Sequence, residues 1–242
     1  MDKSLVIIPT YNEIENIEAI VRKVFSLSVP FHILIVDDGS PDGTADKVKQ
    51  MQLEFPERLH IEERKGKLGL GTAYIHGFRY AIKNDYAYIC EMDADFSHNP
   101  DDLVRLYEAC AIDGYDLAIG SRYVNGITVI NWPIERVLIS YFASKYVQFV
   151  TGIPIHDTTA GFKCYRKKVL EKIDLNSIKF VGYAFQIQLK FLAWKHGFKL
   201  IEVPIIFTDR KLGVSKMSGS IFKEALFGVV ALRIKSIFKQ YN

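Results

Sequence analysis

The sequence predicts an α/β protein with a mostly parallel β-sheet and helices on both faces, a Rossmann-like arrangement. Short apolar runs such as Leu5–Pro9 and Phe31–Val36 lack polar alternation, which is typical of strands buried on both faces. Segments with helical spacing of apolar residues separate these runs, as parallel strands require. Polar residues follow several of the runs directly, at the sheet edge where parallel sheets bind ligands.

The composition of the 242-residue chain is that of a folded globular protein, with 49% hydrophobic and 24% charged residues. Disorder, collagen and coiled coil are excluded. The sequence has no internal repeat and no linker rich in Gly, Ser or Pro, so we expect a single domain over residues 1–242. Three cysteines, Cys90, Cys110 and Cys164, are too few and too widely spaced for a disulfide framework. We interpret them as reduced thiols of a cytoplasmic protein.

No segment has the length of a membrane-spanning helix. The longest stretch without Asp, Glu, Lys or Arg is Val24–Val36, thirteen residues, whereas a span needs about 20 apolar residues. The start of the chain leads into only a short apolar run, so we expect no signal peptide.

The elements alternate regularly in the first half of the chain and less regularly in the second. After the strand Leu5–Pro9, helical spacing runs from Ile14 to Val24. We then expect strands at 31–36, 59–63, 86–92 and 117–120, and helices at 44–53, 72–82 and 102–112. The second half predicts helices at 136–150 and 183–196, a strand at 200–207 and a C-terminal amphipathic helix at 220–239.

The net charge of +3 is unevenly distributed. From Arg210 to Asn242 the chain has seven basic residues and one acid, which gives +6 and leaves the first 209 residues at −3. A basic C-terminal segment indicates an anionic partner such as a phosphate or a lipid headgroup. Nucleic acid is not expected, because the sequence has no recognition motif and no aromatic-basic interleaving on its strands.

Two carboxylates, Asp93 and Asp95, follow the strand expected at 86–92. Residues i and i+2 of an extended chain project in the same direction, so both carboxylates reach one spot. Hard cations such as Mg²⁺ bind a few carboxylate oxygens together with substrate phosphates. The alternative is a solvated acidic turn before the helix cap at Asn99–Asp101.

Polar residues also follow the first two strands. The segment Val36–Thr44 offers acids that accept hydrogen bonds from a ribose or a base, although it also reads as a turn and a helix cap. After the first strand, Tyr11 could stack on a nucleobase and Glu13 could hydrogen-bond it. Both segments therefore point to a nucleotide at this edge.

A basic, glycine-rich loop, Lys65–Thr72, opens a helix and is a candidate anion site. Its glycines, Gly69, Gly71 and Gly77, do not fit the dinucleotide pattern, which excludes NAD. Three further cations, Arg122, Arg210 and Lys216, lie near strand ends and suit phosphate groups. For any one of them alone, a surface charge is the usual interpretation.

Together these segments resemble the family 2 glycosyltransferases, and within them the polyprenol (dolichol) phosphate mannose synthases. The resemblance spans nearly the whole chain in the family's order, and the string KLGLGTAYIHGF is its most specific part. The segments that carry it are 8–13, 36–44, 67–78, 92–98, 120–123 and 203–216.

The resemblance implies a GT-A type nucleotide-diphosphosugar transferase fold and transfer of mannose from GDP-mannose to a polyprenyl phosphate. The guanosine side of the donor would contact Pro9, Tyr11, Glu13, Val36 and Asp38. The diphosphate, the sugar and a Mg²⁺ or Mn²⁺ ion would contact Asp93, Ala94 and Asp95, with both aspartates as metal ligands. This sequence has Ser97 where some members have a metal-binding glutamine.

The resemblance also implies an acceptor site and a membrane. Arg122, Arg210 and Lys216 match positions that meet donor and acceptor phosphates, and Arg136 and Ser140 would hold the acceptor phosphate. Longer members add C-terminal membrane spans. We therefore expect this short form to be peripheral on the cytoplasmic face of a membrane, attached by amphipathic helices or by an anchoring partner protein.

The chemistry would be an inverting, in-line displacement. A phosphate monoester is already anionic at neutral pH, so the enzyme needs no general base. Asp93, Asp95 and Arg122 would then act by positioning and electrostatics. Two alternatives stay open: the same transfer from a UDP-sugar such as UDP-glucose, and a non-catalytic nucleotide-binding subunit.

Overall fold

The computed structural model describes residues 2–178, 180, 182, 184–209, 220–238 and 241. Its strands are β1 (Ser4–Thr10), β2 (His32–Asp37), β3 (Leu59–Glu63), β4 (Tyr88–Glu91), β5 (Leu117–Ser121), β6 (Val129–Ile130), β7 (Lys163–Arg166), β8 (Leu200–Pro204) and β9 (Phe207–Thr208). Its α-helices are α1 (Ile17–Phe25), α2 (Thr44–Gln52), α3 (Leu70–Lys83), α4 (Asp102–Ala111), α5 (Ile134–Thr151), α6 (Lys167–Lys172), α7 (Ala184–Lys195) and α8 (Ser220–Phe238). One 3₁₀ turn lies at Leu175–Ser177.

The main sheet has seven strands in the order β3-β2-β1-β4-β7-β5-β8. All of its pairs are parallel except those of β7, which runs antiparallel to both β4 and β5. The prediction of a mostly parallel sheet is confirmed. Strand β7 was not predicted, because its four residues include charged Lys163 and Arg166 and give no apolar run.

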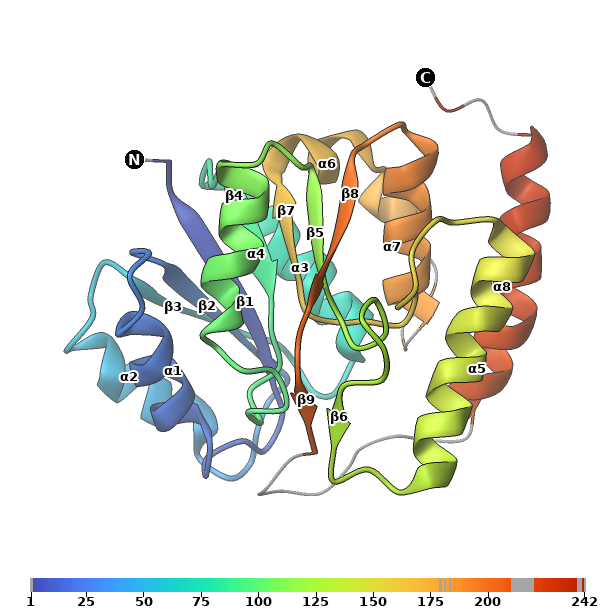
Figure 1. Ribbon diagram of the computed structural model, residues 1–242. Helices are drawn as coiled ribbons and strands as arrows, with labels where there is room; N and C mark the ends of the chain where they lie inside the picture. Colours follow the sequence, from blue (N-terminus) through green and yellow to red (C-terminus); the bar gives the residue numbers. More distant parts are fainter. Residues whose placement is uncertain are drawn as a thin grey trace.

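Helices cover both faces of this sheet, as Figure 1 shows. Along β1 the side chains alternate: Leu5 and Ile7 pack with α3, α6 and α7, whereas Val6 and Ile8 pack with α1, α2 and α4. Each strand of the centre is therefore buried on both sides, which explains why its sequence has no polar alternation.

Helices α5 and α8 form a separate layer beyond α7 (Figure 1). Val147 of α5, Ile187 of α7 and Val229 of α8 make the small core that joins the three helices. The short sheet of β6 and β9 lies beside the carboxyl end of β5 and connects the main sheet to this layer.

Two predicted elements differ from the structure. The strand expected at 200–207 is two strands, because the chain leaves the sheet after Pro204 and pairs again only in β9. In α8, Val229 and Leu232 are buried, but apolar residues also occupy the exposed side. The helix therefore does not have the single apolar face expected from sequence. No helix within the described residues is long and apolar enough to cross a membrane.

Candidate active site

A cavity of about 800 Å³ opens between the carboxyl end of the sheet and helices α5, α7 and α8. Four of the residues singled out in the sequence line it together: Asp93, Arg122, Arg136 and Ser140. The rest of its wall is largely apolar and includes Leu138, Ile139, Phe142, Tyr146 and Leu226. The cavity thus combines a few charged and polar side chains with a largely apolar lining.

The residues predicted to hold the nucleotide lie at the ends of β1 and β2. Asp38 is buried, and its Oδ1 accepts a hydrogen bond from Arg64 Nε at 2.7 Å. Its Oδ2 accepts from the Leu68 amide at 3.2 Å, which ties the glycine-rich loop to the end of β2. Asp37 is fully buried and holds the turn through Ser40. Sequence reasoning missed Arg64, which lies just before the basic loop it had identified.

Pro9, Tyr11 and Glu13 lie at the end of β1, facing this loop. The ammonium group of Lys67 lies 5.2 Å from the centre of the Tyr11 ring. The Glu13 amide donates to Thr44 Oγ1, so the loops after β1 and β2 are joined. Val36, in contrast, is completely buried in the core. Its side chain cannot reach a nucleotide, and any contact from this position uses the backbone.

The two aspartates after β4 differ in their surroundings. The Asp93 side chain is 40% exposed and lines the cavity, whereas Asp95 is buried and its Oδ1 accepts a hydrogen bond from the Ser97 amide at 3.0 Å. Ala94, between them, is buried in the core. Ser97 is buried as well, and its hydroxyl has no hydrogen-bond partner among the described residues.

These residues fit a divalent cation. Two carboxylates and one unpaired hydroxyl are hard oxygen donors, the kind that Mg²⁺ and Mn²⁺ bind. Within the part of the chain that the structure describes, no group of three or more His, Cys, Asp or Glu side chains could hold a metal. The remaining ligands would therefore come from the substrate, as is usual for ions that bind diphosphates.

His98 forms part of the cavity wall beside Asp93. Its ring is buried and stacks on Phe162 with ring centres 4.7 Å apart. Its Nδ1 accepts a hydrogen bond from the Asp93 amide at 3.3 Å, so the proton of the neutral ring is on Nε2. Burial lowers the pKa of His98 to about 4, against the opposing effect of the Asp95 carboxylate.

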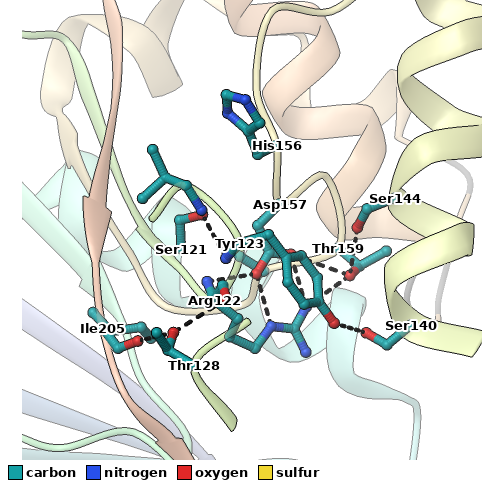
Figure 2. A network of polar contacts seen from close by, with 12 residues as sticks. Ser121, Arg122, Tyr123, Thr128, Ser140, Ser144, His156, Asp157, Thr159 and Ile205 are labelled. Atoms are coloured by element: carbon teal, nitrogen blue, oxygen red, sulfur yellow. Dashed lines mark hydrogen bonds and ion pairs between the residues drawn. The ribbon is translucent and has the colours of Figure 1, made fainter. Parts of the chain in front are cut away.

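Arg122 is held in a buried clamp at the end of β5 (Figure 2). Asp157 Oδ2 accepts hydrogen bonds from the Arg122 backbone amide at 3.0 Å and from Arg122 Nε at 2.7 Å. Asp157 Oδ1 accepts a third from a terminal guanidinium nitrogen of Arg122 at 2.7 Å. Thr159 accepts a further bond at 2.8 Å. Burial alone would raise the pKa of Asp157, but the Arg122 charge and its hydrogen bonds bring that pKa below the ordinary value.

Ser140 faces this clamp from helix α5 (Figure 2). Tyr123 donates its hydroxyl to Ser140 Oγ at 2.7 Å. This bond leaves the Ser140 hydroxyl hydrogen to another acceptor, and Ser140 is one of the residues that line the cavity. One turn earlier, Arg136 lies over the Trp132 ring at 4.0 Å and pairs with Asp209 at 2.8 Å.

The structure thus brings Asp93, Arg122, Arg136 and Ser140 into one cavity and places the predicted nucleotide residues beside it. Arg210 and Lys216 lie outside the described residues. Asp157 and Thr159 were missed because they are 35 and 37 positions from Arg122, and no local pattern connects them.

This arrangement is that of a GT-A glycosyltransferase: a nucleotide edge on a mostly parallel sheet, followed by paired aspartates at a strand end. Solved structures of that fold are similar. Glucosyl-3-phosphoglycerate synthase from Mycobacterium tuberculosis, solved with Mn²⁺ and UDP, has a TM-score of 0.67 at 14% identity, over 97% of this chain and 80% of that one. A mannosyltransferase from Pyrobaculum calidifontis, solved with GDP-Man and Mn²⁺, has a TM-score of 0.57 at 18% identity, over 98% of this chain and 71% of that one.

The chain belongs to glycosyl transferase family 2, whose profile matches residues 5–174. Polyprenol monophosphomannose synthase from Mycolicibacterium smegmatis is 51% identical over 96% of this chain and 88% of its own length. Undecaprenyl-phosphate mannosyltransferase from Micrococcus luteus is 44% identical over 93% of this chain and 91% of its own length. The protein is therefore a glycosyltransferase, and the resemblance drawn from the sequence is confirmed.

Proposed function

We propose that this enzyme transfers mannose from GDP-mannose to a polyprenyl monophosphate, giving polyprenyl phosphate mannose and GDP. The observation that carries the proposal is the lining of the cavity. Arg122, Arg136, Ser140 and Asp93 line it together with many apolar side chains. A phosphate headgroup on a long hydrocarbon chain matches this combination, and the names of the two curated relatives agree with it.

The donor would lie with its nucleotide over the ends of β1 and β2. Tyr11, Glu13 and the loop that Arg64 ties to Asp38 surround that position. The diphosphate would reach Asp93 and Asp95, which fit a Mg²⁺ or Mn²⁺ ion. When bound, such an ion neutralises the charge that develops on the leaving diphosphate.

The acceptor phosphate would lie at the polar end of the apolar groove. Arg136 offers a guanidinium that Trp132 keeps in place, and Ser140 offers the hydroxyl hydrogen that Tyr123 leaves available. Arg122 adds a second positive charge in a position fixed by Asp157. These groups would orient the attacking oxygen, which is already an anion and needs no proton removed.

The hydrocarbon chain of the acceptor would leave through the outer face of α5. Leu138, Ile139 and Phe142 line the cavity and are also 45 to 62% exposed on the surface. Farther along α5, Phe149 is 90% exposed, and α8 adds exposed Phe227 and Ile237. We propose that this apolar surface, the outer face of α5 and α8, lies in the membrane interface on the cytoplasmic side.

A UDP-sugar donor is the alternative for the same site, since the structural relative from M. tuberculosis was solved with UDP. The M. luteus and M. smegmatis relatives, both named for mannose transfer, favour the mannosyl donor because they are far more similar in sequence.

The test uses purified protein, labelled GDP-mannose, a polyprenyl phosphate in detergent or liposomes, and Mg²⁺ or Mn²⁺. We expect metal-dependent label in the organic phase. Label that transfers only from a UDP-sugar would contradict the donor assignment. No transfer from any nucleotide sugar would contradict the proposed function as a whole.

A further inference from the structure

The floor of the cavity contains a buried amide that the mechanism above does not use. Gln186 lies in the first turn of α7, is 2% exposed and lines the cavity together with Asp93 and Arg122. Its neighbours determine the orientation of the side-chain amide. They leave one hydrogen of Gln186 Nε2 without an assigned acceptor.

Two buried charges set the orientation of the Gln186 amide. The ammonium group of Lys163 donates to Gln186 Oε1, and Gln186 Nε2 donates to Glu91 Oε2 at 2.8 Å. Rotating the amide by 180° would put its NH₂ group against the ammonium and its oxygen against the carboxylate, so only one orientation satisfies both. Tyr165 donates to the other Glu91 oxygen at 2.8 Å, which holds that carboxylate in place.

The second hydrogen of Gln186 Nε2 has no acceptor among the described residues, and there is space near this nitrogen at Gly161. A Cβ atom built on Gly161 would lie 3.6 Å from Gln186 Nε2 and 3.9 Å from His98 Cε1. The missing side chain of Gly161 therefore leaves a small space between the amide and the imidazole ring. Both neighbours line the cavity, and Gly161 does as well.

The backbone around Gly161 is held firmly. Lys190 is completely buried and donates to the carbonyl of the preceding residue, Ala160, at 2.6 Å. Just upstream, Asp157 and Thr159 are fixed by Arg122. The space over Gly161 is thus a preformed feature of the cavity and not a loose loop.

The position of this space identifies its ligand. In an in-line displacement the sugar lies between the leaving diphosphate and the attacking phosphate. In the proposed reaction Asp93 and Arg122 would contact these two groups, and Gln186 and Gly161 line the same cavity. A neutral N–H donor in a water-poor recess suits an oxygen without full charge, such as a sugar hydroxyl.

We propose that Gln186 and Gly161 form the subsite for the transferred hexose, with Gln186 Nε2 donating to one of its hydroxyl oxygens and Gly161 leaving room for the ring. This inference rests on the proposed function and adds the residues that recognise the sugar. Gln186 is then a substrate contact, and Lys163 and Glu91 are positioning residues that act through it.

The test compares Gln186→Met and Gly161→Ala with Gln188→Met as the matched control. Gln188 is an equally buried glutamine two residues along the same helix, but its amide donates to the Ser177 carbonyl at 3.4 Å, outside the cavity. The Gly161→Ala methyl meets only ordinary van der Waals distances, and the backbone φ of Gly161 lies outside the left-handed region, so this variant is expected to fold.

The measurements are the Kd values of GDP and of GDP-mannose by calorimetry, and the donor KM and kcat. For Gln186→Met and Gly161→Ala we expect the Kd of GDP to equal that of the wild type. The affinity that the mannosyl group adds, measured as the ratio of the Kd values of GDP and GDP-mannose, should fall by about tenfold, and so should kcat/KM. A loss of about tenfold is the usual cost of one neutral hydrogen bond. Gln188→Met should match the wild type in both.

Three results would overturn the inference: an unchanged ratio of GDP to GDP-mannose affinity in both variants, an equal loss of GDP affinity, or a change confined to the acceptor KM. A wild-type enzyme that ignores GDP-mannose but uses another nucleotide sugar would instead refute the proposed donor, and the same ratio would then be measured with that donor and its nucleotide.

Discussion

The two ends of the sheet present different surfaces to their surroundings. Around α1 and α2 the exposed side chains are mostly charged and paired: Arg22 pairs with Glu18 and Glu54, and Lys49 pairs with Glu63. Along α5 and α8 the exposed side chains include many large apolar ones, namely Ile134, Leu138, Ile139, Phe142, Phe149, Phe227, Val230, Ile234, Ile237 and Phe238. The same chain thus has one side with paired charges and another with many exposed apolar side chains.

The reaction site lies where these two regions meet. Asp93 and Asp95 follow β4 of the main sheet, whereas Arg136 and Ser140 belong to α5, on the apolar side. The comparison indicates that, under the proposed function, donor and acceptor would be bound by different layers of the fold. It also predicts that substitutions in the two regions affect different substrates.

The largest effect is expected for Asp95→Ala, which removes one of the two carboxylates proposed to hold the metal. We expect transfer to fall by about 10²–10³-fold, as for other single groups that stabilise developing charge. Thermal unfolding should confirm a folded protein. The control is Asp101→Ala, an exposed acid after the same strand that pairs with Lys23, which should retain full activity. Near-normal turnover of Asp95→Ala would refute the metal assignment.

The next effect concerns the clamp that connects the two regions. Asp157→Ala leaves the Arg122 guanidinium buried without this carboxylate, which is expected to lower the free energy of unfolding by about 3–5 kcal/mol. Urea denaturation measures this loss. Lys49→Ala, which removes a surface ion pair, should cost less than about 1 kcal/mol. Equal losses in the two variants would show that the clamp has no special structural role.

A smaller effect is expected for the membrane surface. The double substitution Phe149→Ser with Phe238→Ser removes two rings that are 90% and 84% exposed on the apolar side. We expect binding to anionic liposomes to weaken by about tenfold, since each ring buries apolar area in the interface. Leu53→Ser, at an 85% exposed position beyond the end of α2, is the matched control and should bind liposomes normally. Equal liposome binding by the wild type, the double variant and Leu53→Ser would contradict the assignment of membrane contact to the α5 and α8 side.

The smallest effect concerns stability at low pH, at the edge of the sheet where β2 and β3 begin. Burial lowers the pKa of His32 and of His60, which lie on β2 and β3 and share the Tyr86 hydroxyl. The unfolded chain therefore takes up protons first. Stability is fully present above the unfolded pKa of about 6.5 and is lost as pH falls from there through the folded values. His60→Gln should flatten the slope of unfolding free energy between pH 7 and about 5; an unchanged slope would contradict the assignment.

Sequence reasoning reached the features that depend on local patterns. The buried strands of the first half, the paired aspartates after β4 and the cation Arg122 follow from apolar runs and from what comes directly after them, whereas Arg136 was expected only from the family resemblance. Strand β7 could not be predicted from such patterns, and neither could the presence of apolar residues on both sides of α8. From sequence Lys163 resembles a surface charge, and only the fold pairs it with Glu91. The sequence pattern of α8 does not show that apolar residues lie on both its buried and its exposed sides.

Long-range partners were the main omission at the site. Arg64, Asp157 and Gln186 each take their role from a residue at least 26 positions away: Asp38, Arg122 and Glu91 respectively. No spacing in the sequence links such pairs, because the sheet order and the antiparallel insertion of β7 bring them together. The chemistry of single residues was thus accessible from sequence, whereas their positioning required the fold.

The most direct test of the division between donor and acceptor regions is the dependence of mannosyl transfer on acceptor chain length. Initial rates would be measured with polyprenyl phosphates from short to long at fixed metal, with the donor varied at each length. The account predicts that kcat/KM for the acceptor rises with chain length until the apolar groove and the membrane surface are filled, while the donor KM stays constant. A kcat/KM that is independent of chain length, or a donor KM that changes with it, would contradict the account.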